Sequence, residues 1–131
     1  VLAMRPEVLI LDEPTAGLDP RGRDEILDEI SALHKDKQMT LVLVSHSMED
    51  IARYADRILV MSHGEKLFDA PPKEVFRHYR ELERIGLAAP QITYVVQKLR
   101  EEGIPLQEDI TTVEEAKAAI LKLLGKAGSE A

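Results

Sequence analysis

An unbroken aliphatic run, residues 8–11, followed at once by two carboxylates and a proline, constrains this chain more than any other feature. A strand without polar alternation is typical of a parallel sheet that helices cover on both faces. A second apolar run spans residues 40–44. We therefore expect both segments to be buried strands of an α/β fold.

Helix and turn signals fill the segments between and after these strands. Asp19 followed by Pro20 favours the start of a helix, and apolar residues then recur at helical spacing. A third strand is expected over residues 57–61, and His63-Gly64 predicts a tight hairpin into a fourth strand. The order strand, helix, strand, helix, strand implies right-handed parallel crossovers. Because only three strands look central, the sequence resembles the C-terminal part of a larger sheet protein.

The sequence from about residue 79 onward has a helical pattern throughout. One amphipathic helix is predicted to end at Gly103, and a second is predicted to begin at a capping box of Thr112 and Glu115. We therefore divide the chain into an α/β domain over residues 1–78 and a helical extension over residues 79–131. The apolar stripes of the extension either pack on their own domain or meet a partner.

The composition excludes several classes of protein. Acidic residues outnumber basic ones by 24 to 17, and the net charge of −7 argues against nucleic-acid binding. The chain has no cysteine, which excludes a disulfide framework and a cysteine-based zinc site. Its unbroken aliphatic runs reach only four residues, whereas a membrane-spanning helix needs about 20. No signal peptide is expected either.

The two carboxylates at the end of the first strand are the candidate chemistry. Ligands of α/β proteins bind at the C-terminal edge of the sheet, where Asp12 and Glu13 would lie. Asp12 there could hold Mg²⁺ through water, and Glu13 could orient a water molecule for attack. An Asp-Glu pair by itself is more often a solvated turn, so the neighbouring motifs decide the reading.

Three ordered motifs resemble the C-terminal half of an ATP-binding-cassette (ABC) ATPase, a member of the P-loop NTPase fold class. The segment 9–14 resembles the Walker B motif, and the segment 16–19 resembles the D-loop. His46, just after the second strand, resembles the switch histidine. The resemblance covers residues 1–78 and implies that ATP and Mg²⁺ are the cofactors.

The resemblance also implies a role for each matching residue. Asp12 would coordinate Mg²⁺ through water, and Glu13 would be the general base that polarises the attacking water. His46 would contact the γ-phosphate. Gly17 and Asp19, in the D-loop-like segment, would belong to the nucleotide site at the seam between two subunits. These roles suit phosphoryl transfer, in which positioning and charge stabilisation dominate.

Other elements of that family are missing from the 131 residues. The sequence has no G-x-x-x-x-G-K-[ST] loop, no glutamine-bearing coupling loop and no LSGGQ-like signature. In the family these elements precede the Walker B motif, and residues 1–7 would be the end of the helix that follows the signature. Without a phosphate-cradling loop, we expect the chain alone neither to bind nor to hydrolyse ATP measurably.

The tail resembles the C-terminal extension of energy-coupling factor (ECF) ATPases, which power uptake of vitamins and of cobalt or nickel ions. The residues that carry this resemblance are Leu82, Ile85, Gly86, Leu87, Pro90, Leu99 and Gly103. It implies a second ATPase subunit, identical or paralogous, held partly by the extension. It also implies a transmembrane coupling protein, a substrate-capture membrane protein and a peripheral location on the cytoplasmic face of the membrane.

Two alternative functions remain open at this point. The chain could be a truncated, non-catalytic module that dimerises or binds partners through its C-terminal helices. It could instead be a soluble ABC-family ATPase that takes no part in transport, although a long coiled-coil insertion or basic linker is missing.

Overall fold

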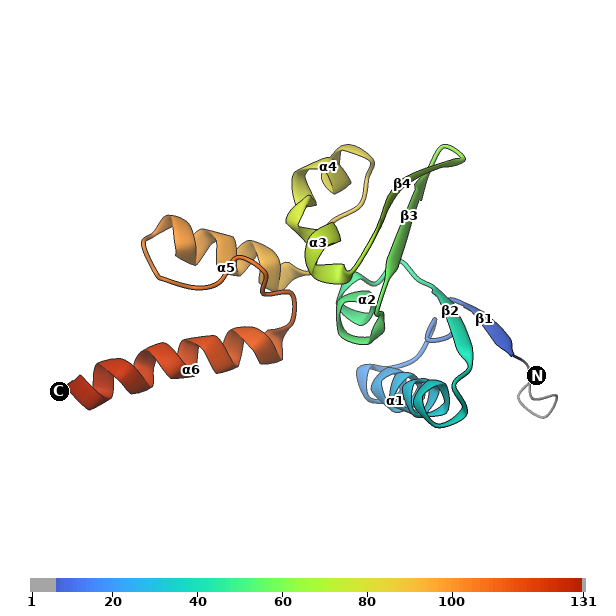
Figure 1. The fold of residues 1–131 in the computed structure, drawn as a ribbon, viewed down its shortest axis with the longest axis horizontal. Helices are drawn as coiled ribbons and strands as arrows, with labels where there is room; N and C mark the ends of the chain where they lie inside the picture. Colours follow the sequence, from blue (N-terminus) through green and yellow to red (C-terminus); the bar gives the residue numbers. More distant parts are fainter. Residues whose placement is uncertain (1–6, 131) are drawn as a thin grey trace. The chain divides into compact units, whose positions relative to one another are not determined.

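The computed structural model describes residues 7–130 (Figure 1), and the chain divides into two compact units with a boundary between His46 and Ser47. The predicted helix end at residues 1–7 falls almost entirely outside the described range. The boundary between the units differs from the division at residue 78 drawn from the motifs, which stays a prediction about functional segments.

The first unit consists of β1 (Val8–Asp12), α1 (Pro20–Lys37) and β2 (Thr40–Val44). The two strands pair in parallel, with Val8 opposite Thr40 and Asp12 opposite Val44. As predicted, α1 begins at Asp19, whose carboxylate accepts a hydrogen bond from the Gly22 N–H at 2.9 Å. This unit is therefore a single β-α-β crossover, the repeating element of parallel α/β sheets.

The expectation that these strands are buried on both faces is wrong for this chain. Leu9 is only 5% exposed, but its neighbour Ile10 is 66% exposed. Strand alternation and the parallel register place Ile10 on one face with three other exposed aliphatic residues, Val8, Val42 and Val44. The reason is that the unit contains one helix, which can cover only one face of the two strands.

The second unit begins with α2 (Met48–Tyr54), β3 (Ile58–Ser62) and β4 (Glu65–Ala70). The hairpin between the two strands is confirmed: they pair antiparallel, and His63 and Gly64 both have positive φ angles, 49° and 78°. Such a pair of angles belongs to the two-residue turns that match the strand twist. Arg57 donates two hydrogen bonds to Asp69 across the hairpin.

The expectation of a third parallel strand is wrong. Within residues 7–130 the strands form two separate two-stranded sheets, β1 with β2 and β3 with β4. A two-residue turn can join only antiparallel strands, so β4 pairs antiparallel with one edge of β3. Neither β1 nor β2 pairs with the other edge of β3 in this part of the chain. The coarser prediction of a mixed α/β chain is confirmed.

Four further helices complete the second unit: α3 (Pro72–Arg77), α4 (Tyr79–Arg84), α5 (Gln91–Glu101) and α6 (Val113–Glu130). Around the β3–β4 hairpin lies a hairpin core, which consists of Ile58, Val60, Val75, Phe76, Leu82 and Ala89. A separate helical-pair core joins α5 and α6, and it consists of Val96, Leu106, Ile110 and Ala116. The predicted helical pair at the C-terminus is thus present (Figure 1), and the helical-pair core is its apolar interior. No helix in the described part of the chain is long and apolar enough to cross a membrane.

Candidate functional site

The candidate site lies at the C-terminal edge of the β1–β2 pair. Asp12 is the last residue of β1 and lies opposite Val44, the last residue of β2. Glu13 follows Asp12 directly, and His46 comes two residues after Val44. Because the strands are parallel, these residues leave the sheet at the same edge, as the sequence predicted.

The backbone at Glu13 has an unusual conformation. Its φ angle is 47°, in the left-handed region that a non-glycine residue rarely adopts. Its N–H donates a hydrogen bond of 2.8 Å to the carbonyl of Val44, so the turn is fixed to the neighbouring strand. A left-handed residue of this kind costs about 1–3 kcal/mol, and such conformations cluster at functional sites.

The left-handed turn brings the Glu13 carboxylate to His46. The Nδ1 atom of His46 lies 2.7 Å from Oε1 of Glu13, and the backbone N–H of His46 donates to the same oxygen at 3.2 Å. Since an ionised carboxylate only accepts hydrogen bonds, Nδ1 carries the hydrogen in this contact. The other ring nitrogen, Nε2, is then the one with which His46 would meet a phosphate.

The exposure of the two side chains suits a site that receives a ligand from solvent. The side chain of Glu13 is 34% exposed, and that of His46 is 85% exposed. An oriented carboxylate can accept a proton from an attacking water, and a histidine side chain protonated on both ring nitrogens can also donate to an anion. The structure therefore brings together two of the five residues predicted for the site.

The remaining predicted residues lie in or beside the loop that follows β1. Gly17 has a φ angle of 79°, which glycine adopts without strain, and turns at Glu13–Ala16 and Thr15–Leu18 shape the loop. Asp19 uses its carboxylate to cap α1. This contact gives Asp19 a structural role in its own helix, separate from the predicted role at a subunit seam.

Asp12 fits Mg²⁺ only in the company of nucleotide phosphates. It is exposed at the strand end, and carboxylate oxygen is a ligand that Mg²⁺ prefers. No group of three or more histidine and acidic side chains that could hold a metal occurs among the residues described. Mg²⁺ commonly keeps several waters and uses one or two carboxylates together with substrate phosphates, so one carboxylate is sufficient on that plan.

Two backbone groups of the site were not predicted: the carbonyl of Val44 and the N–H of His46, which fix the turn and the carboxylate of Glu13. Their only signal in the sequence is their position: Val44 ends the second apolar run and His46 follows it closely. The left-handed backbone of Glu13 has no signal there, because glutamate has no particular preference for that conformation.

Comparison with known proteins adds close relatives, although no family model matches the chain. It is 58% identical over 123 residues to the energy-coupling factor transporter ATP-binding protein EcfA2 of Clostridium tetani, covering 94% of the chain and 43% of that protein. The EcfA2 of Symbiobacterium thermophilum is 52% identical over 131 residues, covering 99% and 45%. The chain therefore spans less than half the length of the curated relatives it matches.

A solved structure is also similar. It is cbiO1 from Clostridium perfringens, described as part of the ABC transporter complex cbiONQ, with 36% identity and a TM-score of 0.55 over 73% of this chain and 38% of that one. These likenesses show that the chain is homologous to ABC transporter ATP-binding proteins. Within that class, it is a close homologue of the energy-coupling factor ATP-binding proteins.

Proposed function

We propose that the chain is the C-terminal part of the ATPase subunit of an ECF-type importer, with the partial sheet and helical extension of an ABC ATPase. The observation that carries this proposal is the contact between Glu13 and His46 at the ends of adjacent parallel strands. Close homology to ATP-binding proteins of ECF transporters supports the same conclusion.

In this proposal Glu13 is the general base for ATP hydrolysis. Its carboxylate accepts the proton of the attacking water. The His46 N–H holds that carboxylate, and the Val44 carbonyl accepts the backbone N–H of Glu13 and fixes the turn. With both ring nitrogens protonated, His46 donates from Nδ1 to Glu13 and from Nε2 to the γ-phosphate, and so stabilises charge on the transferred group. Gly17 and Asp19 shape the nucleotide site at the seam between two subunits.

Asp12, which directly precedes Glu13 in the sequence, would hold Mg²⁺ through its water shell. The metal, when bound with ATP, neutralises charge on the phosphates. The 131 residues contain no glycine-rich phosphate loop to cradle those phosphates. The chain by itself is therefore inactive in this proposal, and turnover requires the segment that carries the loop.

The partners and location follow from the same assignment. A second ATPase subunit, a transmembrane coupling protein and a substrate-capture membrane protein complete an importer for metal ions or vitamins at the cytoplasmic face of the membrane. The outer surface of α6 supports the first of these partners, because Val113, Leu121 and Leu124 are exposed there. The same residues favour a second candidate function, a dimerising module without catalysis.

Glu13→Gln in the complete subunit tests the catalytic assignment. Loss of a general base costs about 100-fold or more in turnover, while magnesium-dependent ATP binding should persist. Glu29→Gln is the matched control, because Glu29 is exposed on α1. Full turnover in Glu13→Gln would contradict the assignment. Magnesium-dependent turnover by the isolated chain that Glu13→Gln abolishes would instead contradict the proposal that the chain by itself is inactive. If the coding frame upstream of Val1 lacks a phosphate loop, the non-catalytic module is favoured.

A further inference from the structure

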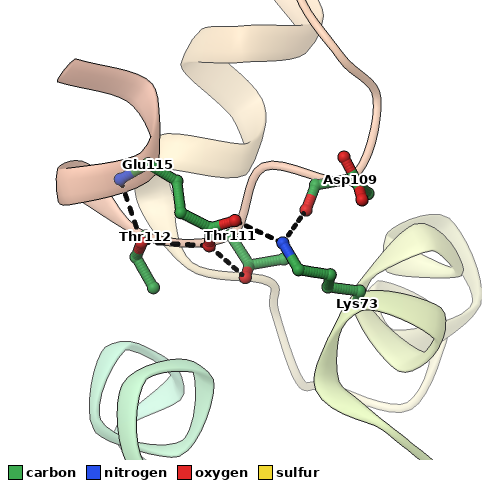
Figure 2. A network of polar contacts seen from close by, with 5 residues as sticks. All are labelled: Lys73, Asp109, Thr111, Thr112 and Glu115. Atoms are coloured by element: carbon green, nitrogen blue, oxygen red, sulfur yellow. Dashed lines mark hydrogen bonds and ion pairs between the residues drawn. The ribbon is translucent and has the colours of Figure 1, made fainter. Parts of the chain in front are cut away.

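The first turn of α6 is attached to α3 by polar contacts. The helix α6 packs on α5 through the helical-pair core, whereas α3 belongs to the hairpin core. Lys73 of α3 bridges the two, donating to the carbonyl of Asp109 at 2.8 Å and to the carboxylate of Glu115. Figure 2 shows this clasp, which comprises Lys73, Asp109, Thr111, Thr112 and Glu115.

The two oxygens of Glu115 have separate tasks in the clasp. Oε1 accepts hydrogen bonds from the hydroxyls of Thr112, at 3.0 Å, and Thr111, at 3.3 Å. The Glu115 N–H donates to the Thr112 hydroxyl at 3.2 Å, which is the helix-capping half of the box predicted from the sequence. Oε2 accepts the ammonium of Lys73. The threonine hydroxyls therefore orient the carboxylate that Lys73 contacts.

The position of Lys73 in its own helix indicates that it serves the clasp. It lies in the first turn of α3, where the helix dipole disfavours a cation. Glu115 lies in the first turn of α6, where the dipole favours an anion. Burial raises the pKa of Glu115, but the hydrogen bonds from Lys73 and Thr112 outweigh this effect and bring it below its ordinary value of 4.5.

A second polar contact joins the helical pair to the rest of the unit. Glu49 of α2 accepts a hydrogen bond of 3.1 Å from the backbone N–H of Gln91, the first residue of α5. Both helices of the pair are thus anchored at their N-termini by charged side chains from the part of the unit that contains the hairpin. Tyr94 of α5 also packs against the hairpin core, beside Tyr79 of α4, so the polar anchors set the angle of the pair about an apolar contact.

We propose that the Lys73–Glu115 contact is a lock that fixes the orientation of the helical pair α5–α6 relative to the hairpin core. With the lock closed, the exposed stripe of α6 is held at one angle. With the lock open, the pair keeps its own core and turns about the contact between Tyr94 of α5 and the hairpin core. A stripe held at one angle would favour association with a second subunit, and this consequence rests on the function proposed above.

Two variants open the lock without removing the helix cap. Lys73→Met keeps most of the aliphatic stem and loses the charge, whereas Glu115→Gln keeps a capping side chain and loses the ion pair. Glu114→Gln, on the exposed neighbour in the same turn, is the matched control. Because the chain has no cysteine, Arg84→Cys and Lys122→Cys give a single pair of labelling sites on α4 and α6.

The experiment measures amide exchange over residues 107–116 and the distance distribution between the two labels in the 131-residue chain. We expect about three- to tenfold faster exchange and a broader distribution in each single variant, with no further change in the double variant. Glu114→Gln should match the parent. Unchanged exchange and distance in Lys73→Met would overturn the lock, as would additive effects in the double variant.

Self-association of the complete subunit, measured by sedimentation, is a separate readout. A complete subunit that never associates would contradict the proposed function and leave the lock to be decided by exchange and distance. A subunit that associates equally well with the lock open would overturn only its consequence for association.

Discussion

The two units of the molecule differ in how completely they satisfy their own apolar residues. The second unit buries two separate cores, one around the β3–β4 hairpin and one between α5 and α6. The first unit buries Leu9, Leu27 and Met39 but exposes four aliphatic side chains on the opposite face of its strands. The strands β1 and β2, whose sequences predict burial on both faces, are therefore buried on one face only.

The contrast shows that local pairing and non-local pairing place different demands on a chain. In the β3–β4 hairpin and in the helical pair, the two elements that pack together are near each other in the sequence, so each element has its partner within the same short segment. The β1–β2 pair needs a crossover helix, and its second face needs another layer. The candidate site at its edge depends on that less complete unit, whereas the lock belongs to the more complete one.

The largest effect should come from the hairpin core. Phe76 is 2% exposed there, and Phe76→Ala should lower the free energy of unfolding of the second unit by about 3–5 kcal/mol. Urea denaturation measures the change. Leu67→Ala, on a strand residue that is 43% exposed, is the control and should cost far less. A loss below about 1 kcal/mol in Phe76→Ala would show that this unit does not fold around the core described.

A smaller effect is expected at the cap of α1 in the first unit. Asp19→Ala removes the acceptor for the Gly22 N–H and should cost about 1 kcal/mol. Amide exchange over residues 20–24 measures the loss. Asp19→Asn keeps a capping side chain and removes the charge, so it should preserve the helix. If Asp19→Asn nevertheless abolishes turnover in the complete subunit, the charge has a role at the seam beyond the cap.

Much of the local structure could be predicted because its signals are local. The cap at Asp19, the turn at His63-Gly64 and the capping box at Thr112 each depend on residues within a few positions. The sequence predicted only that Glu13 and His46 lie at the same edge of the sheet. Their direct contact depends on the left-handed backbone of Glu13, which a glutamate in the sequence does not predict.

The features that escaped prediction depend on residues far apart in the sequence. Lys73 and Glu115 are separated by 42 positions, and nothing in either segment identifies the other as its partner. The exposed face of β1 was misjudged for a related reason. The hydrophobicity of a strand predicts that both of its faces need to be covered. It does not show whether other segments of the chain supply the layers that cover them.

Acid should weaken the second unit through two carboxylates. The hydrogen bond from Arg57 lowers the pKa of Asp69 below its ordinary value of 3.8. For Glu115, burial raises the pKa, but the hydrogen bonds from Lys73 and Thr112 bring it below 4.5. A depressed pKa in the folded state stabilises above the unfolded pKa, and this stabilisation is lost as the pH falls through the folded value. Urea titrations between pH 6 and pH 3 should show stability falling below about pH 4.5.

Arg57→Met and Lys73→Met sharpen this pH dependence. Each should flatten the fall in stability below about pH 4.5, because the carboxylate that remains titrates nearer its ordinary value. A fall of equal steepness in both variants would mean that other groups govern the acid response of the second unit.

The smallest effect on stability should come from the exposed face of the first unit. Ile10 is 66% exposed, and threonine suits a strand, so Ile10→Thr should change the free energy of unfolding by about 0.5 kcal/mol or less. The variant should scatter less light at the same concentration, because it presents less apolar surface for association. Leu9→Ala, on the buried face of the same strand, should cost about 2–5 kcal/mol. A comparable loss in Ile10→Thr would mean that this face is covered in solution, and the contrast between the two units would then disappear.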